Sequence, residues 1–382
     1  MFYPRALHID QFKTSSFLFG PRMTGKTTLL HSIISVEYID LMDPDLELSY
    51  KSDPKLFWQQ LSALPKGSLI IVDEVQKVPV LLNYVQKAMD TMDQRFILSG
   101  SSARKLKRGG ANLLGGRALD LKLYPLTTDE LKNDFHMDRA LHYGTLPKIC
   151  DLLHARQTDL VKQHLKSYIT TYIREEIQAE ALTRNLGAFN RFLNIAAQAN
   201  GQVIEFANIS RECSVPMSTV KEYFQILEDT LIGFFLWPWD RSERKKARPK
   251  FYFFDCGVAR AIQNRLNDPP TMVETGILFE TWLVNELHRM RDYSQKEHTF
   301  SFWRQREEEV DILISNSRGP VFAIECKTGR GDLRRPTITQ FRKTFPKVPL
   351  VVASLRDNKP RKIGTQDVWP WQQVLTYYKD NL

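Results

Sequence analysis

The chain has 382 residues and a formal net charge of +9, with 42% apolar and 25% charged residues. This composition is typical of a soluble globular protein and excludes a disordered or fibrous architecture, and the length predicts roughly two to four domains. The sequence has no run of about 18 uncharged apolar residues, and its first residues lack the apolar segment of a secretory signal. We therefore expect a cytoplasmic protein with no membrane partner.

Neither the net charge nor the cysteines identify a partner or a metal. The basic excess is spread along the chain, so only a local cluster of basic residues would indicate nucleic acid. The four cysteines are scattered and form no CxxC pair. The sequence therefore predicts neither a zinc site nor a disulfide framework, and we expect free thiols in a reducing compartment.

Residues 20–27 read GPRMTGKT and match the phosphate-binding pattern GxxxxGK[ST]. A short buried strand is predicted before them, at residues 16–19, and a helix after them, at residues 26–35. In that setting the loop N–H groups and the helix dipole surround phosphates, Lys26 adds a positive charge, and Thr27 ligates magnesium. The candidate nucleotide-binding residues are Gly20, Pro21, Arg22, Met23, Thr24, Gly25, Lys26, Thr27 and Thr28.

A second element supports the nucleotide site. Residues 68–74 read SLIIVDE, an apolar strand that ends in two carboxylates. Asp73 is expected to hold magnesium through water, and Glu74 to activate the water that attacks the γ-phosphate. The alternative is a buried strand followed by two solvated acids. The presence of both motifs at this spacing favours a site for ATP and Mg²⁺.

The third predicted strand, at residues 95–102, ends in polar residues. Ser101 is our candidate for sensing the γ-phosphate. Arg117 precedes a further strand, at residues 119–123, and is our candidate for an arginine finger inserted into a neighbouring subunit's site. A surface cation on a turn is the alternative for Arg117.

The sequence resembles a family of AAA-type ATPases from prokaryotes whose C-terminal half is a domain of unknown function. The resemblance implies an AAA-type parallel-sheet core that binds ATP and Mg²⁺. The motifs that carry it are residues 20–27, 70–76, 98–104, 114–117 and 123–126 with Glu130, and, further along the chain, residues 251–257, 278–280, 303–304 and 323–327. Together they cover nearly the whole chain.

Helical periodicity dominates after residue 144, and we interpret residues 136–186 as a helical lid. Arg174 there is a candidate to face the nucleotide, with a helix-surface ion pair as the alternative. Residues 187–265 are interpreted as a winged helix-turn-helix, with helices at 189–199, 207–213 and 216–231. The third helix is expected to expose Ser218, Thr219, Lys221 and Glu222 near its start.

A predicted hairpin follows, and its connection, residues 240–250, is strongly basic. This is a local cluster of the kind that contacts DNA phosphates without sequence preference. A solvated charged face and a protein contact are the alternatives. DNA is therefore the expected partner of this region.

The C-terminal region is predicted to contain a helix at residues 276–290 and strands at 299–305, 309–315 and 321–326. Glu325 and Lys327 are two residues apart on one strand and face the same way. With Asp311 they resemble the Asp…Glu-x-Lys arrangement of restriction-endonuclease-like folds, including Holliday-junction-resolvase and Mrr-like nucleases, whose helix glutamate corresponds to Glu280. This resemblance implies a magnesium site at Glu280, Asp311 and Glu325, with Lys327 orienting water; ordinary strand-end charges are the alternative.

The expected fold is thus α/β and multidomain. We expect an AAA-type ATPase core at residues 1–135, a helical lid at 136–186, a winged helix at 187–265 and a restriction-endonuclease-like domain at 271–382. The main hypothesis is an ATPase that assembles into a homo-oligomer through Arg117, binds DNA and carries a metal-dependent nuclease site. The alternatives are a nucleotide-switched signalling module whose C-terminal domain does not cut, and a plain DNA-binding regulator.

Overall fold

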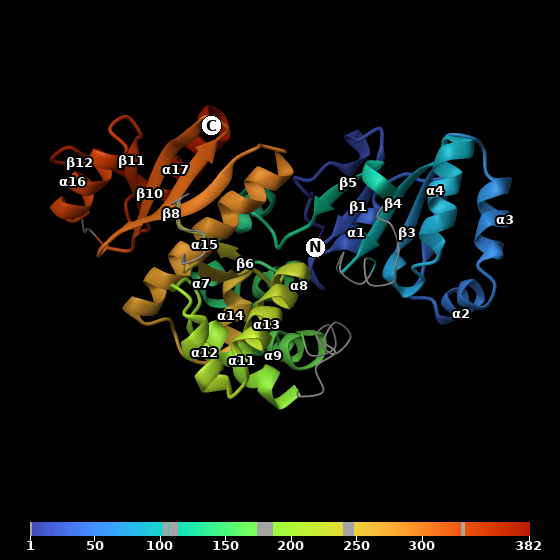
Figure 1. Cartoon of the computed structure of the whole chain (residues 1–382), viewed down its shortest axis with the longest axis horizontal. Coiled ribbons are helices and arrows are strands. Elements are labelled where there is room, and N and C mark those ends of the chain that lie inside the picture. The colour runs from blue at the N-terminus through green and yellow to red at the C-terminus, as the bar shows by residue number, and fades with distance from the viewer. Residues whose placement is uncertain (1, 102–105, 107–113, 174–185, 240–247, 330–332) are drawn as a thin grey trace.

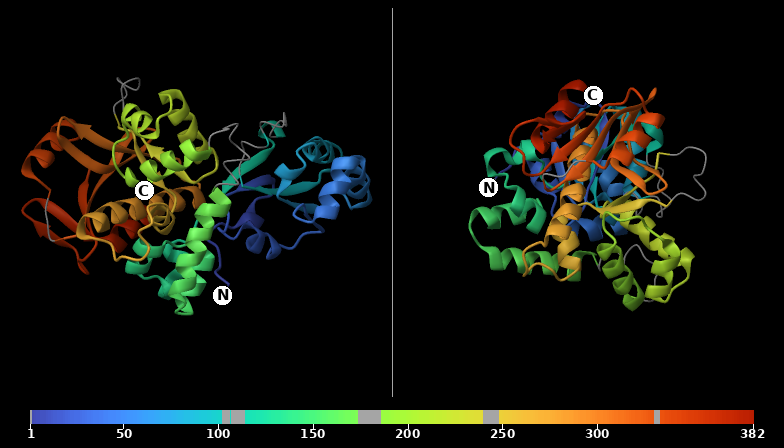
Figure 2. Two further views of the ribbon diagram at one scale, coloured as in Figure 1. Left: turned by 90° about the horizontal axis from the view of Figure 1, so that it is seen from below. Right: turned by 90° about the vertical axis from the view of Figure 1, so that its left-hand side faces the viewer.

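The computed structural model describes residues 2–101, 106, 114–173, 186–239, 248–329 and 333–382. Figure 1 shows three lobes: an N-terminal α/β lobe, a mainly helical middle lobe, and a C-terminal lobe built on a second sheet. Figure 2 shows the same three lobes from two further directions. Arg174 and the basic residues 240–247 lie outside the described residues.

The N-terminal lobe is a parallel five-stranded sheet in the order β2-β3-β4-β1-β5. Its central strands are buried along their length, as expected for a parallel sheet covered on both faces. This confirms the predicted parallel-sheet core. Its strands are β1 (Ser15–Phe19), β2 (Glu37–Asp40), β3 (Leu69–Asp73), β4 (Arg95–Gly100) and β5 (Ala118–Lys122).

The helices of this lobe connect the strands. They are η1 (Ile9–Gln11), α1 (Lys26–His31), α2 (Pro44–Ser52), α3 (Lys55–Ala63), η2 (Val75–Lys77), α4 (Leu81–Met92) and η3 (Leu114–Gly116), followed by α6 (Thr128–Leu131) and η4 (Lys132–Asp134). Helix α1 ends at His31 instead of residue 35, because the chain turns at Ser32 to enter β2.

The middle lobe has one buried apolar core that extends from Leu146 to Leu266. It therefore includes residues of both the predicted lid and the predicted winged helix, and their division into two domains stays a prediction. The elements are α7 (Met137–Tyr143), α8 (Pro147–His154), α9 (Thr158–Ser167), the π-helical turn η5 (Tyr168–Ile173), α11 (Leu186–Gln198), α12 (Phe206–Cys213), α13 (Met217–Asp229), the antiparallel strands β6 (Gly233–Leu236) and β7 (Lys250–Phe253), and α14 (Cys256–Ile262).

The C-terminal lobe is a mixed six-stranded sheet in the order β12-β13-β11-β10-β9-β8. Helices α15 and α17 pack on one face of the sheet, and α16 packs on the other. The three predicted strands are present, whereas the elements after residue 345 were not predicted. The bounds are α15 (Met272–Tyr293), β8 (Thr299–Gln305), β9 (Glu308–Asn316), β10 (Gly319–Lys327), α16 (Arg335–Thr344), β11 (Leu350–Ser354), β12 (Arg361–Ile363), β13 (Gln366–Pro370) and α17 (Trp371–Asn381).

Helix α15 joins the three lobes. It contacts β5 in the N-terminal lobe, α7 and α14 in the middle lobe, and β10 and α17 in the C-terminal lobe. At its C-terminal end the Tyr293 hydroxyl accepts a hydrogen bond from the Tyr124 N–H at 3.0 Å, and Tyr124 donates to Asp292. Figure 1 shows this helix lying between the C-terminal sheet and the middle lobe. The position of the N-terminal lobe is thus linked to the C-terminal half.

Arg5 forms a buried ion pair within the N-terminal lobe. Its Nε lies 2.9 Å from Glu130 Oε1, and its Nη1 donates to the Thr24 carbonyl at 2.6 Å. Loss of one partner of a buried pair leaves the other charge uncompensated. We expect Arg5→Met to lower the free energy of unfolding by about 3–5 kcal/mol in denaturant titrations. Lys13→Met, at an exposed position, is the control; equal stability of the two variants would contradict this role.

His288 on α15 gives the fold a dependence on pH. Its ring stacks on Phe234, with 4.1 Å between centroids, and burial lowers its pKa well below the ordinary value. The unfolded chain therefore binds a proton below about pH 6.5 that the folded chain does not, so stability decreases as the pH falls. We expect His288→Phe to remove up to about 1.4 kcal/mol of this decrease per pH unit between pH 6.5 and 5. Denaturation of both forms across this range, with exposed His136→Gln as control, checks it; parallel pH profiles would contradict it.

Candidate nucleotide site and carboxylate cluster

The predicted phosphate-binding loop connects β1 to α1. Gly25 has a left-handed backbone (φ 90°), and a Cβ on Gly20 would lie 2.4 Å from the Leu123 carbonyl oxygen, so both positions require glycine. The Lys26 ammonium donates to the Gly20 and Pro21 carbonyls at 2.8 and 3.2 Å. Lys26 therefore already lies over the loop that a phosphate group would enter.

Asp73 connects this loop to β3. Its Oδ2 accepts hydrogen bonds from the Thr27 hydroxyl at 2.8 Å and from the Tyr38 hydroxyl at 2.9 Å. Its Oδ1 accepts from the Ser99 hydroxyl and from the Glu74 N–H. The structure thus brings the predicted Thr27 and Asp73 together. Two adjacent oxygen donors, one of them a carboxylate, fit a Mg²⁺ ion.

Two residues around Asp73 were missed by sequence reasoning. Tyr38 belongs to β2, which carries no recognisable motif. Ser99 lies within β4, two residues before the predicted Ser101, which follows the strand. The alternation of side chains along an extended segment, which places residues two apart on the same face, is the signal that could have found Ser99.

Glu74 lies at the end of β3 with a left-handed backbone (φ 57°). Its carboxylate accepts a hydrogen bond from the Gln76 amide. Gln76 packs closely on Gly100, where a Cβ would lie 2.6 Å from Gln76 Oε1. Glu74 is half-buried. Glu74 directly follows Asp73 in the chain, and the hydrogen bond from Gln76 holds the Glu74 carboxylate in place.

Ser101 and Arg117 lie at different ends of the sheet. Ser101 is buried beside the loop, where it lines a small cavity with Pro21 and Arg22. Arg117 precedes Ala118, which pairs with Ser15 at the start of β1. The loop follows the other end of β1, about 13 Å away at about 3.3 Å per residue. Arg117 is half exposed and lies 3.3 Å from Asp90, so it is remote from the loop of its own chain.

A cavity of about 440 Å³ lies beside the loop. It is formed where the first residues of the chain, the loop and the start of the middle lobe meet. Its volume is within the range of small-molecule sites. Met23, Gly25 and Thr28 are among the predicted nucleotide-binding residues, whereas the first residues of the chain and the start of the middle lobe were not predicted to contribute. The lining includes Tyr3, Met23, Thr28, Leu29, Leu126 and Pro147.

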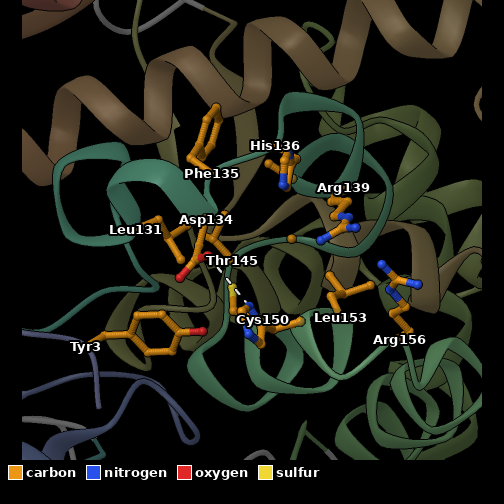
Figure 3. Close-up of a pocket in the computed structure, with 13 residues that line it drawn as sticks. Tyr3, Leu131, Asp134, Phe135, His136, Arg139, Thr145, Cys150, Leu153 and Arg156 are labelled. Carbon is orange, nitrogen blue, oxygen red and sulfur yellow. Dashed lines mark ion pairs between the residues drawn. The ribbon is translucent and has the colours of Figure 1, made fainter. Parts of the chain in front are cut away.

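A second cavity, of about 260 Å³, lies on the other side of Tyr3. Figure 3 shows Tyr3 at one end of it and Arg139 and Arg156 at the other. Asp134 forms an ion pair with His154 at 3.6 Å. None of the predicted site residues lines this cavity, and no sequence motif indicated it.

The four predicted C-terminal residues lie in one cluster. Glu280 comes from α15, Asp311 from β9, and Glu325 and Lys327 from β10. Lys327 Nζ donates to Glu325 Oε1 at 2.7 Å, and Asp311 Oδ2 accepts from the Cys326 N–H at 2.8 Å. Burial, followed by the nearby Asp311 charge, raises the pKa of Glu280 to about 7 and that of Glu325 to about 8.

Lys250 on β7 enters this cluster and was missed by sequence reasoning. Its Nζ lies 2.8 Å from Glu280 Oε1, 2.6 Å from Glu309 Oε1 and 3.6 Å from Asp311 Oδ1. The only signal was its position at the end of the basic connection, which indicated phosphate contact instead.

The cluster does not fit the predicted divalent ion in this arrangement. Lys250 Nζ contacts Glu280 Oε1 and Asp311 Oδ1, and the other oxygen of Asp311 accepts from the Cys326 N–H. Among the described residues, no group of three or more His, Cys, Asp and Glu side chains is arranged to hold a metal ion. Of the predicted magnesium ligands, Glu280 and Asp311 therefore contact the Lys250 ammonium, whereas Glu325 pairs with Lys327.

The start of α13 is the candidate DNA surface. Ser218, Lys221 and Glu222 are exposed there, and Thr219 is partly exposed. Helices α11, α12 and α13 pack on one another and are followed by the β6–β7 pair, in the order expected for a winged helix. Arg248, at the end of the basic connection, forms an exposed ion pair with Glu205 at 2.9 Å.

Comparisons with known proteins agree with these three lobes. Residues 13–132 match an AAA domain, residues 134–268 a domain of unknown function (DUF8612), and residues 275–374 another domain of unknown function (DUF4143). The chain is 25% identical to uncharacterized proteins of Mycobacterium tuberculosis and Mycobacterium bovis, over 81% of this chain and 69% of each relative. An uncharacterized protein of Haemophilus influenzae is 22% identical, over 65% of this chain and 70% of that protein.

Two solved structures show weak similarity. The Aeropyrum pernix ORC1 protein in complex with DNA has a TM-score of 0.29 and 13% identity, covering 67% of this chain and 87% of that one. The replication initiator DnaA bound to AMPPCP and single-stranded DNA has a TM-score of 0.27 and 14% identity, covering 57% and 83%. None of the helices in the described ranges has the length and apolar character needed to cross a membrane. The family match, the parallel sheet and the loop geometry together identify residues 13–132 as an AAA domain.

Proposed function

We propose that this protein binds ATP at the loop between β1 and α1 and hydrolyses it. The observation that carries the proposal is the 2.8 Å contact between the Thr27 hydroxyl and Asp73. It places the phosphate-binding loop next to the two carboxylates at the end of β3, so binding and hydrolytic groups share one site.

Each group has a role that its geometry supports. The Lys26 ammonium exchanges its contacts with the loop carbonyls for contacts with phosphate oxygens. Thr27 and Asp73 hold Mg²⁺, which supplies positive charge beside the phosphates when bound. Glu74 accepts a proton from the attacking water, and Ser101 contacts the γ-phosphate. The cavity of about 440 Å³ beside the loop accommodates the nucleoside part of ATP.

Equilibrium dialysis with labelled ATP and Mg²⁺ tests binding at this loop. Wild-type protein is expected to bind ATP, and Lys26→Ala to weaken binding by about tenfold or more, because one unit of positive charge is lost at the phosphates. Lys55→Ala removes the same charge from an exposed position on α3 and is the control. Unchanged binding by Lys26→Ala would contradict the proposed site.

The second candidate function is DNA binding through α13. Lys221 is exposed near the start of this helix, beside exposed Ser218, in the position of a recognition helix. A phosphate contact at Lys221 predicts salt-dependent binding whose slope falls by about one when this lysine is removed. Fluorescence anisotropy with duplex DNA, comparing Lys221→Ala with exposed Lys347→Ala, tests it. Identical slopes for the two variants would contradict a DNA role for α13.

The C-terminal domain is proposed as a binding domain that does not cut, in preference to the nuclease hypothesis. The reason is the arrangement of Lys250 with Glu280 and Asp311. The protein would then couple ATP turnover to a macromolecular partner without cleaving it.

A further inference from the structure

The carboxylate cluster between α15 and β9 is organised around a single nitrogen atom. The Nζ of Lys250 is in ion-pair contact with Glu280, Glu309 and Asp311. The three carboxylates come from two elements, α15 and β9, and surround one cation. Oxygen ligands commonly surround a bound metal ion in this way. Here the cation belongs to the chain itself.

The backbone around Lys250 fixes this position. Lys250 pairs with Leu236 in the β6–β7 hairpin and forms an isolated bridge to Val203. Its side chain is only 4% exposed. Two residues further along β7, the Tyr252 hydroxyl donates to the same oxygen of Glu280. Lys250 is therefore a buried ion-pair partner with a fixed backbone position, unlike a solvent-exposed lysine.

The hairpin is also attached to the edge of the C-terminal sheet. Just after β6, the Trp239 N–H donates to the Phe302 carbonyl of β8 at 2.8 Å, and the Phe302 N–H donates to the Trp237 carbonyl at 3.1 Å. The Phe302 ring lies 5.5 Å from Lys250 Nζ. The hairpin that carries Lys250 is therefore held against the C-terminal sheet, next to the carboxylate cluster.

The charges require a cation here. Buried carboxylates are unfavourable unless they are paired or coordinate a metal. A lysine ammonium is a compact point charge with three donors, and here two of the acids lie within 2.8 Å of Nζ while Asp311 lies at 3.6 Å. A divalent ion would have to displace this ammonium before it reached both Glu280 and Asp311.

We propose that Lys250 is the resident cation of the cluster and takes the position that a divalent metal ion would otherwise occupy. The wild-type cluster then binds no metal, and its role is to fasten the β6–β7 hairpin to the C-terminal domain. Removal of the ammonium leaves the acids without their cation and turns the cluster into a metal site. The inference is independent of ATP hydrolysis.

Manganese binding to the nucleotide-free full-length protein tests this proposal, with free Mn²⁺ measured by electron paramagnetic resonance. Lys250→Met keeps most of the side-chain volume and removes the charge. We expect it to bind about one more Mn²⁺ per chain than wild type does, because a positive charge at contact distance from the acids is lost. Adding Asp311→Asn should abolish the gain, and the exposed control Lys347→Met should behave as wild type.

Two results would overturn the proposal. One is Mn²⁺ binding by wild-type protein that Asp311→Asn abolishes, since the metal would then displace Lys250. The other is a folded Lys250→Met variant that gains no Mn²⁺ site. If that variant does not fold, Lys250→Gln retains a hydrogen-bond donor and carries the same expectation. Thermal unfolding gives a second measurement: Mn²⁺ should raise the midpoint of the Lys250 variant more than that of wild type, and adding Asp311→Asn should remove the difference.

Discussion

Glu74→Gln is expected to bind ATP as wild type does and to hydrolyse it about 10²–10⁴-fold more slowly. The glutamine keeps the shape of the side chain and its neighbour Gln76, but it cannot accept a proton from water. Asp73, Thr27 and Lys26 are untouched, so the phosphates and magnesium keep their ligands. Phosphate release under saturating ATP measures the loss, and equilibrium dialysis measures the retained affinity.

The control for this substitution is Glu37→Gln, which changes an exposed acid on β2 of the same lobe. It should leave turnover near the wild-type value. Turnover of Glu74→Gln within about twofold of wild type would exclude Glu74 as the general base.

Arg117→Ala is expected to lower turnover by about 10³-fold or more without weakening ATP binding, if Arg117 completes the site of a neighbouring subunit. Arg117 is half exposed, its partner Asp90 is equally exposed, and it lies beside the start of β1, remote from the loop of its own chain. Its contribution to turnover therefore requires a second chain. Arg318→Ala, at an exposed turn between β9 and β10, is the matched control.

Mixing two inactive variants separates action between chains from action within one chain. Arg117→Ala supplies an intact loop, and Lys26→Ala supplies an intact Arg117. A mixture should recover part of the activity and do so more completely at higher protein concentration. An inactive mixture, or full activity of Arg117→Ala alone, would contradict an arginine finger.

Local sequence was sufficient to predict that the phosphate-binding loop and the end of β3 lie together, because both are short recognisable segments. The loop and the end of β3 each carry their functional residues within a few positions, and a parallel sheet brings its strand ends together. Tyr38 and Ser99 donate hydrogen bonds to Asp73 from two other strands. Their proximity depends on the order of the strands in the sheet, which no single segment of the sequence specifies.

The C-terminal cluster shows where sequence reasoning stopped. The pattern Asp311, Glu325 and Lys327 correctly predicted that these residues meet, since they lie on neighbouring strands. It did not predict Lys250, which reaches Glu280 and Asp311 from another part of the chain through tertiary packing. Lys250 follows a run of basic residues, and that position favours a phosphate contact. Its side chain is buried instead and is the counter-ion of acids within the protein. Arg5 was missed for the same reason, because its partner Glu130 is distant in sequence.

The most direct test of the central claim is steady-state phosphate release from ATP and Mg²⁺ by the purified wild-type protein, with Lys26→Ala prepared in parallel. Because the Lys26 ammonium lies over the phosphate-binding loop, we predict turnover by wild type and none above background by Lys26→Ala. Absence of turnover by wild type across a range of concentrations, or equal turnover by the two proteins, would contradict an ATPase at this site.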